Sequence, residues 1–267
     1  NLKQIGLAMH NYHDSANMFP VTYGFSSLSG GGVDYSENGR GHSWFQFILP
    51  HIDQAPLYNK IDFNVGYASG TNNTVAKTRM NAFICPTDPG NPGLLAGRAN
   101  ISNVEYAVQN YKAVAGSNWA WGVFQPVTST MGRNRNSTNG LDAGNGLMCR
   151  GASGTGPQHS TNIGQVRDGT SNTFAVGEAL PARCTHTSWY HFNHVTATCA
   201  VPLNYYQKDQ TIAPTDWPNN YSFASTHVGG GHFLMADGAV KFISENIDLT
   251  MYRNLATISG DEVATIE

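Results

Sequence analysis

The stretch HVGGGHFLMADGAVKFI, residues 227–243, decides the fold class of this chain. An Asp-Gly pair between two apolar runs is the strongest short signal for a β-hairpin, because glycine adopts the positive φ that a tight turn needs. Asp237-Gly238 therefore predicts a hairpin with a strand on each side. Other short apolar runs, separated by Gly, Asn and Pro, occupy residues 82–85, 111–115, 122–124 and 174–177. Their length and spacing indicate further antiparallel strands.

The beginning of the chain predicts a helix. Leu2, Ile5, Met9 and Tyr12 recur every three or four residues, which places them on one helical face. Pro20 disfavours helical backbone at the residue before it, so we expect the helix over 1–18. Because the apolar stripe is in phase from its first turn, we expect this segment to be the C-terminal part of a longer helix.

These patterns predict an α+β protein, with the helix packed on an antiparallel sheet. We expect one globular head domain over residues 19–267, since no second domain boundary is visible. Two stretches, near 125–165 and 180–222, are rich in Asn, Gly, Thr and Pro. That composition is typical of loops, and we expect both stretches to be long surface insertions.

The composition narrows the class of function. Charged residues make up 12% of the chain and its net charge is −3, so it lacks the basic stripe that nucleic-acid binding requires. Hydrophobic residues make up 40%, which is enough for a core. A neutral, hydrogen-bonding surface is common on extracellular proteins. We therefore expect an extracellular or cell-surface location.

The four cysteines lack any C-x-x-C pair, which argues against a ribbon-type zinc site. They are Cys85, Cys149, Cys184 and Cys199. In an exported protein two disulfides are the default, so we expect all four to be oxidised, and Cys184–Cys199 is favoured because it closes a short loop. The alternative is a zinc knuckle that combines Cys184 and Cys199 with His186, His191 and His194.

Two further groups of side chains suggest ligands. His227, His232 and Asp237 are a possible metal triad, but five residues separate His232 from Asp237, so on one strand they face opposite sides. We therefore prefer a structural role, in which His227 bonds to nearby backbone and Asp237 builds the turn. Trp119 and Trp121 are candidates for stacking on sugar rings, although buried tryptophans more often belong to a core.

Catalytic motifs are missing from the sequence. There is no G-x-S-x-G nucleophile elbow, no P-loop, and no G-x-G-x-x-G after a strand. Paired carboxylates need no fixed spacing, but no pair stands out. We expect no catalytic centre.

Several motifs in order resemble a bacterial prepilin-type family of unknown function. They are NLKQIGLAMHNYHD at 1–14 followed by Phe19-Pro20, WFQFILP at 44–50, FICPTDP at 83–89, DGTSNTFAVGE at 168–178, and the H-x9-D-G motif from His227 to Gly238. The resemblance covers nearly the whole chain. It implies a pilin-like or pseudopilin-like fold, in which a long N-terminal helix carries a globular head on a β-sheet.

The resemblance implies a structural subunit of a surface filament or of a secretion-associated assembly. Self-assembly would run through the N-terminal helix, and membrane contact only through a hydrophobic segment upstream of it. The motif residues are then expected to be structural: Cys85, Asp168, Gly169, Glu178, His227, Asp237 and Gly238. No cofactor is expected. The alternative is that His227 and Asp237 bind a divalent ion, calcium through the carboxylate, as some pseudopilins do near their C-termini. The rival functions are an extracellular glycan-binding module that takes a polysaccharide, and, less favoured, an extracellular metal-dependent hydrolase.

Overall fold

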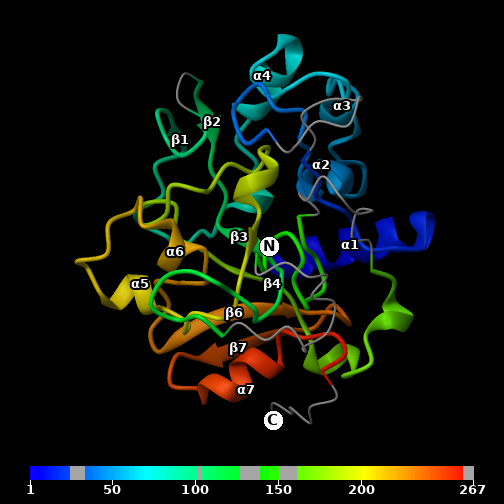
Figure 1. Cartoon of the computed structure of the whole chain (residues 1–267). Coiled ribbons are helices and arrows are strands. Elements are labelled where there is room, and N and C mark those ends of the chain that lie inside the picture. The colour runs from blue at the N-terminus through cyan, green and yellow to red at the C-terminus, as the bar shows by residue number, and fades with distance from the viewer. Residues whose placement is uncertain (25–33, 102–103, 127–138, 151–160, 261–267) are drawn as a thin grey trace.

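The computed structural model describes residues 1–24, 34–101, 104–126, 139–150 and 161–260 (Figure 1). It is an α+β fold, as the sequence predicts. The α-helices are α1 (Leu2–Ala16), α2 (Trp44–Ile48), α3 (Ala55–Tyr58), α4 (Gly70–Ala76), α5 (Tyr205–Lys208), α6 (Trp217–Asn220) and α7 (Leu249–Asn254). The 3₁₀ turns are η1 (Leu49–Ile52), η2 (Asn81–Phe83), η3 (Ile163–Gln165), η4 (Thr170–Asn172) and η5 (Phe192–His194).

A five-stranded sheet with the order β5-β3-β4-β6-β7 forms the centre of the fold. Its strands are β3 (Tyr111–Val114), β4 (Phe174–Glu178), β5 (Thr196–Ala197), β6 (Gly230–Met235) and β7 (Val240–Ser244), and a separate pair joins β1 (Leu94–Leu95) to β2 (Tyr106–Ala107). All neighbours in the large sheet are antiparallel except β3 and β5. Asp237-Gly238 turns β6 into β7 as predicted, with φ of 85° at Gly238.

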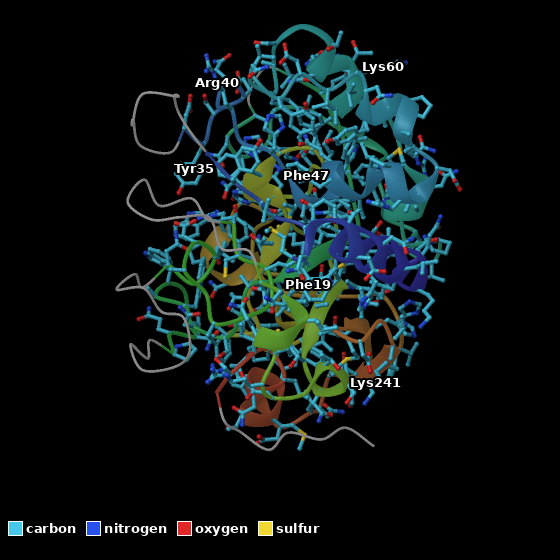
Figure 2. The ribbon with its side chains drawn as sticks, turned by 90° about the vertical axis from the view of Figure 1, so that its right-hand side faces the viewer. Phe19, Tyr35, Arg40, Phe47, Lys60 and Lys241 are labelled. Carbon is cyan, nitrogen blue, oxygen red and sulfur yellow. The ribbon has the colours of Figure 1, made fainter. Side chains whose placement is uncertain are left out.

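Helix α1 packs on the sheet through the predicted apolar face. Leu2, Ile5 and Met9 are buried, and the helix ends where Asn17 takes a left-handed conformation. In Figures 1 and 2, α2–α4 lie on one side of α1, and β6, β7 and α7 lie on the other. Gly6 allows the close approach to β6, because a Cβ there would lie 2.6 Å from Leu234 Cδ1.

Some local predictions were wrong. Residues 82–85 form a 3₁₀ turn and coil, and residues 122–124 form no strand. The stretch 180–222 is mostly buried rather than a surface loop, and it contributes Trp189 and Phe192 to the core. Of the other expected insertion, 127–138 and 151–160 lie outside the described residues, while 139–150 is buried almost throughout. Among the described residues, no helix combines the length and the apolar character needed to cross a bilayer.

Candidate metal centre

Three residues from three different sequence motifs meet beside the start of α1. Cys85 follows η2, Glu178 is the last residue of β4, and His227 precedes β6. Cys85 Sγ lies 3.7 Å from Glu178 Oε1 and 4.0 Å from His227 Nε2, and Oε1 lies 3.4 Å from Nε2. The three donor atoms therefore lie close enough together to share one ion.

Backbone and side-chain hydrogen bonds hold the Cys85 and Glu178 donors in place. The backbone N–H of Cys85 donates to Asn110 Oδ1 (3.0 Å), and Asn110 in turn donates to the carbonyl of Ala179, next to Glu178. Glu178 Oε2 accepts the backbone N–H of His232 at 2.8 Å. Cys85 and Glu178 are 7% and 4% exposed, so both donors are positioned inside the protein.

The site opens into a pocket of about 310 Å³. Lys3, Tyr111 and His232 are among its lining residues. Burial raises the pKa of Tyr111, and the nearby Cys85 adds to the effect. The His232 ring stands edge-on to His227 with 4.7 Å between centroids, and His232 Nδ1 lies 3.7 Å from Glu178 Oε2.

The possible metal triad of His227, His232 and Asp237, which the sequence pattern did not favour, does not form. His227 lies before β6 and Asp237 after it, so the length of the strand separates them. Asp237 Oδ1 instead accepts the backbone N–H of Ala239 inside the hairpin turn. His227 also does not bond to that turn, because its Nε2 faces Thr87 Oγ1 (3.3 Å), Glu178 and Cys85.

From the sequence, Cys85 and Glu178 were expected to be structural residues of two separate motifs. Their role as candidate metal ligands was missed, because nothing in the sequence places the two motifs together. Asp168 and Gly169 lie elsewhere and support the fold. Asp168 Oδ2 accepts from Thr257 Oγ1 at 2.9 Å and from the backbone of Gly260 at 2.8 Å. Gly169 precedes η4 as its N-cap, with φ of 95°.

The expected disulfides are not present: Cys85, Cys149, Cys184 and Cys199 are all buried thiols. Cys184 and Cys199 have different neighbours, which explains why they do not pair. Cys184 Sγ accepts from Lys112 Nζ at 3.4 Å, whereas Cys199 belongs to an apolar cluster with Tyr252.

The alternative, a zinc knuckle around Cys184 and Cys199, is not assembled either. Two of its histidines already use a ring nitrogen in a hydrogen bond with the backbone. His194 Nδ1 accepts the N–H of Ser188, and His191 Nδ1 accepts the N–H of Asn193. Within the described residues, only the Cys85–Glu178–His227 group has the geometry of a metal site.

Trp119 and Trp121 do lie together, with ring centroids 4.9 Å apart. Trp119 is buried, whereas Trp121 is partly exposed. Both line a second pocket, which shares no lining residue with the first.

The fold and the site define an α+β protein in which one helix docks on a mixed sheet beside a cysteine-glutamate-histidine cluster. A family model described as "Protein of unknown function (DUF1559)" matches residues 1–250, so the chain belongs to this family. No curated protein and no solved structure matches the chain.

Proposed function

We propose that this protein is a pilin-like surface subunit whose head binds a divalent ion of the zinc type through Cys85, Glu178 and His227. The convergence of the three donor atoms supports the metal site. In a tetrahedral zinc site, bonds of about 2.0–2.3 Å place neighbouring donors about 3.3–3.6 Å apart. The distances of 3.4, 3.7 and 4.0 Å are close to these values, so small side-chain movements would complete the site.

A nucleophilic cysteine is a weaker interpretation of the same residues. In a cysteine-histidine-acid relay, the thiol and the acid contact opposite nitrogens of the imidazole ring. Here Cys85 Sγ and Glu178 Oε1 both approach Nε2 of His227. Donors that meet at one point suit a metal ion better than a chain of proton transfers.

The donor set also favours zinc over calcium. Thiolate and imidazole are ligands of zinc and similar transition metals, whereas calcium takes oxygen ligands, usually six to eight of them. An ion at this site would tie together three segments that lie far apart in the sequence. Because it binds the folded chain and not the unfolded one, it would stabilise the head.

The test of the metal site is zinc titration of the purified, metal-stripped protein by calorimetry, combined with elemental analysis. We expect stoichiometric zinc and a loss of affinity of about 100-fold or more in Cys85→Ala and His227→Ala, since even outer-shell changes cost 10–100-fold. Cys149→Ala is the matched control, because it removes a buried thiol outside the site. Failure of the wild-type chain to bind zinc, or equal affinity in Cys85→Ala, would contradict the proposal.

The proposal of a filament subunit is supported by the prepilin-like motifs and by α1. One face of α1 packs on the head, while Leu7 on the opposite face is 64% exposed beside a hollow of about 470 Å³ that Lys3, His10 and Gly238 also line. An exposed apolar residue on the first helix suits contact with other subunits. Fusion of the chain to the hydrophobic helix of a prepilin, with co-expression of the peptidase, should give membrane-held or filamentous material. Persistently soluble monomers would count against it.

A metal-dependent hydrolase is the second candidate function, because the pocket of about 310 Å³ adjoins the donors. Catalytic zinc sites have three protein ligands and leave one position to water. The zinc-loaded protein and its Cys85→Ala variant should be compared on nitrophenyl esters of acetate and phosphate. Zinc-dependent turnover that the variant lacks would favour the hydrolase over a purely structural site.

A further inference from the structure

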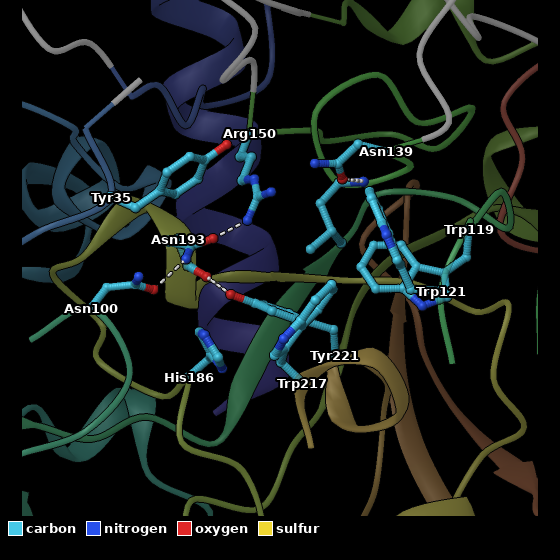
Figure 3. Close-up of a pocket in the computed structure, with 11 residues that line it drawn as sticks. Tyr35, Asn100, Trp119, Trp121, Asn139, Arg150, His186, Asn193, Trp217 and Tyr221 are labelled. Atoms are coloured by element: carbon cyan, nitrogen blue, oxygen red, sulfur yellow. Dashed lines mark hydrogen bonds between the residues drawn. The ribbon is translucent and has the colours of Figure 1, made fainter. Parts of the chain in front are cut away.

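We propose that the second pocket binds a neutral sugar ring. This pocket has a volume of about 280 Å³ and combines aromatic and amide side chains around Arg150 (Figure 3). Its size is near the lower end of the range of about 300–1,000 Å³ for ligand sites, which suits a single small ring or the end of a longer chain. Sugar binding in this pocket and metal binding at Cys85, Glu178 and His227 are independent of each other.

The aromatic wall of the pocket has a fixed part and an accessible part. Trp119 Nε1 donates to the carbonyl of Pro218 at 2.8 Å, and Tyr221 Oη donates to that of Asn193 at 2.7 Å, so both rings are held in place. Trp121 and Trp217 pack edge-on against Trp119, with centroids 4.9 and 6.1 Å from it. Trp217 is 39% exposed.

Such a wall is suited to the apolar side of a sugar. A pyranose ring presents C–H groups on its faces, and the negative face of an indole ring attracts their partial positive charge. Neither Trp121 nor Trp217 uses its indole N–H within the part of the chain that the structure describes, so both can also donate to a ligand hydroxyl. The rigid rings lose little conformational entropy when they bind.

The polar wall is a chain of hydrogen-bonded side chains that ends in amides. Asn139 Nδ2 donates to Asp142, Arg150 Nε donates to Asp142 at 2.5 Å, and Arg150 also donates to Asn193. Asn193 continues the chain by donating to Asn100 Oδ1 at 2.8 Å (Figure 3). Amides both donate and accept, which matches the hydroxyl groups of a sugar.

The charges near the pocket argue against ionic ligands. Asp142 already neutralises Arg150, so an anion would have to compete with this buried ion pair. A quaternary ammonium group, the other usual ligand of aromatic clusters, would be repelled by the buried Lys112, whose Nζ lies 5.2 Å from the centre of the Tyr221 ring and already provides that ring with a cation. Burial first, and then Lys112 and Arg150, hold the pKa of His186 well below its usual value, so this histidine adds no charge.

The test is binding to an array of immobilised oligosaccharides, with cellotriose, maltotriose, chitotriose and trigalacturonic acid as probes, followed by calorimetry on each hit. We expect saturable binding to at least one neutral trisaccharide. Trp121→Ala and Trp217→Ala should each weaken it about tenfold or more, because each removes a stacking surface. The matched control is Phe242→Ala, which removes an aromatic side chain that is exposed on β7.

Thermal melts of each variant verify that it is folded, and Cys85→Ala should retain full sugar binding because the pockets share no lining residue. Absence of binding to every neutral probe would overturn the inference. So would binding of trigalacturonic acid alone, or unchanged affinity in both tryptophan variants.

Discussion

Glu178 Oε1 lies 3.4 Å from His227 Nε2, and the other carboxylate oxygen of Glu178 accepts the backbone N–H of His232 at 2.8 Å. The second contact fixes the carboxylate, so that Oε1 points toward His227 and Cys85. Glu178 ends β4 and His227 precedes β6, and these two strands are neighbours in the sheet. Strand pairing therefore places two of the three proposed metal donors.

Glu178→Gln should separate folding from metal binding. Glutamine has the same shape and can still accept the backbone N–H of His232. Its neutral amide oxygen, however, is a much weaker zinc ligand than the carboxylate of Glu178. Zinc at about 100 times its dissociation constant stabilises a protein by about 2.7 kcal/mol, and the variant should lose most of this gain. Thermal melts with zinc and with EDTA measure the difference.

Glu245→Gln is the control for this experiment, because Glu245 pairs with Lys208 outside the site. It should retain the full zinc-induced shift in melting temperature. An equal shift in Glu178→Gln would show that the carboxylate is not a ligand.

Three buried histidines should make the metal-free protein sensitive to acid. Burial lowers the pKa of His191 from 6.5 to about 4, and burial also holds the pKa values of His186 and His194 well below 6.5. Below pH 6.5 the unfolded chain therefore binds protons that the folded chain does not, and stability falls as the pH drops toward 4. For His191 alone the loss across this window is about 3 kcal/mol.

Urea unfolding in EDTA at a series of pH values measures this effect, because EDTA removes the contribution of metal binding to stability. The slope of the unfolding free energy against pH counts the protons taken up on unfolding. We expect His191→Asn to reduce this slope. A free energy of unfolding that stays constant between pH 6.5 and 4 would contradict the prediction.

Gly6→Val should weaken the docking of α1 on the sheet. A side chain at Gly6 would meet Leu234 Cδ1 at 2.6 Å, so either Leu234 or the helix must shift. Overpacking of this kind costs about 1–3 kcal/mol, and urea unfolding should show a loss in that range. Leu7→Ala, at the exposed neighbouring position, should stay within about 0.5 kcal/mol of wild type. A Gly6→Val variant as stable as wild type would show that the contact does not limit packing.

The sequence predicted the parts of the fold that are determined by residues close together along the chain. The turn at Asp237-Gly238 and the apolar face of α1 are local patterns, and both were confirmed. The stretch 180–222 was mispredicted because its polar side chains satisfy buried backbone groups. Asn220, for example, donates to the carbonyl of Pro214 at 2.9 Å and is fully buried. Composition alone cannot distinguish such a segment from a surface loop.

The cysteine-glutamate-histidine cluster could not be predicted from spacing. Cys85, Glu178 and His227 lie in separate motifs, and only the pairing of β4 with β6 and the position of the loop after η2 bring them together. The same sequence pattern suggested His232 and Asp237 as partners because they are close in sequence. In the fold, the length of β6 separates Asp237 from the cluster.

Thiol titration of the denatured protein, without reductant, should find four thiols, in contrast to the oxidised state that the sequence led us to expect.

In the native protein the reaction should be slow, since all four thiols are buried, and burial raises the pKa of the Cys199 thiol far above its usual value. Cys85 should react first, because it lines the pocket of about 310 Å³. Zinc should slow this first phase, and Cys85→Ala should abolish it and reduce the denatured count to three thiols. A count of two or none in the wild-type protein would show that disulfides form, and a first phase that zinc leaves unchanged would count against Cys85 as a ligand.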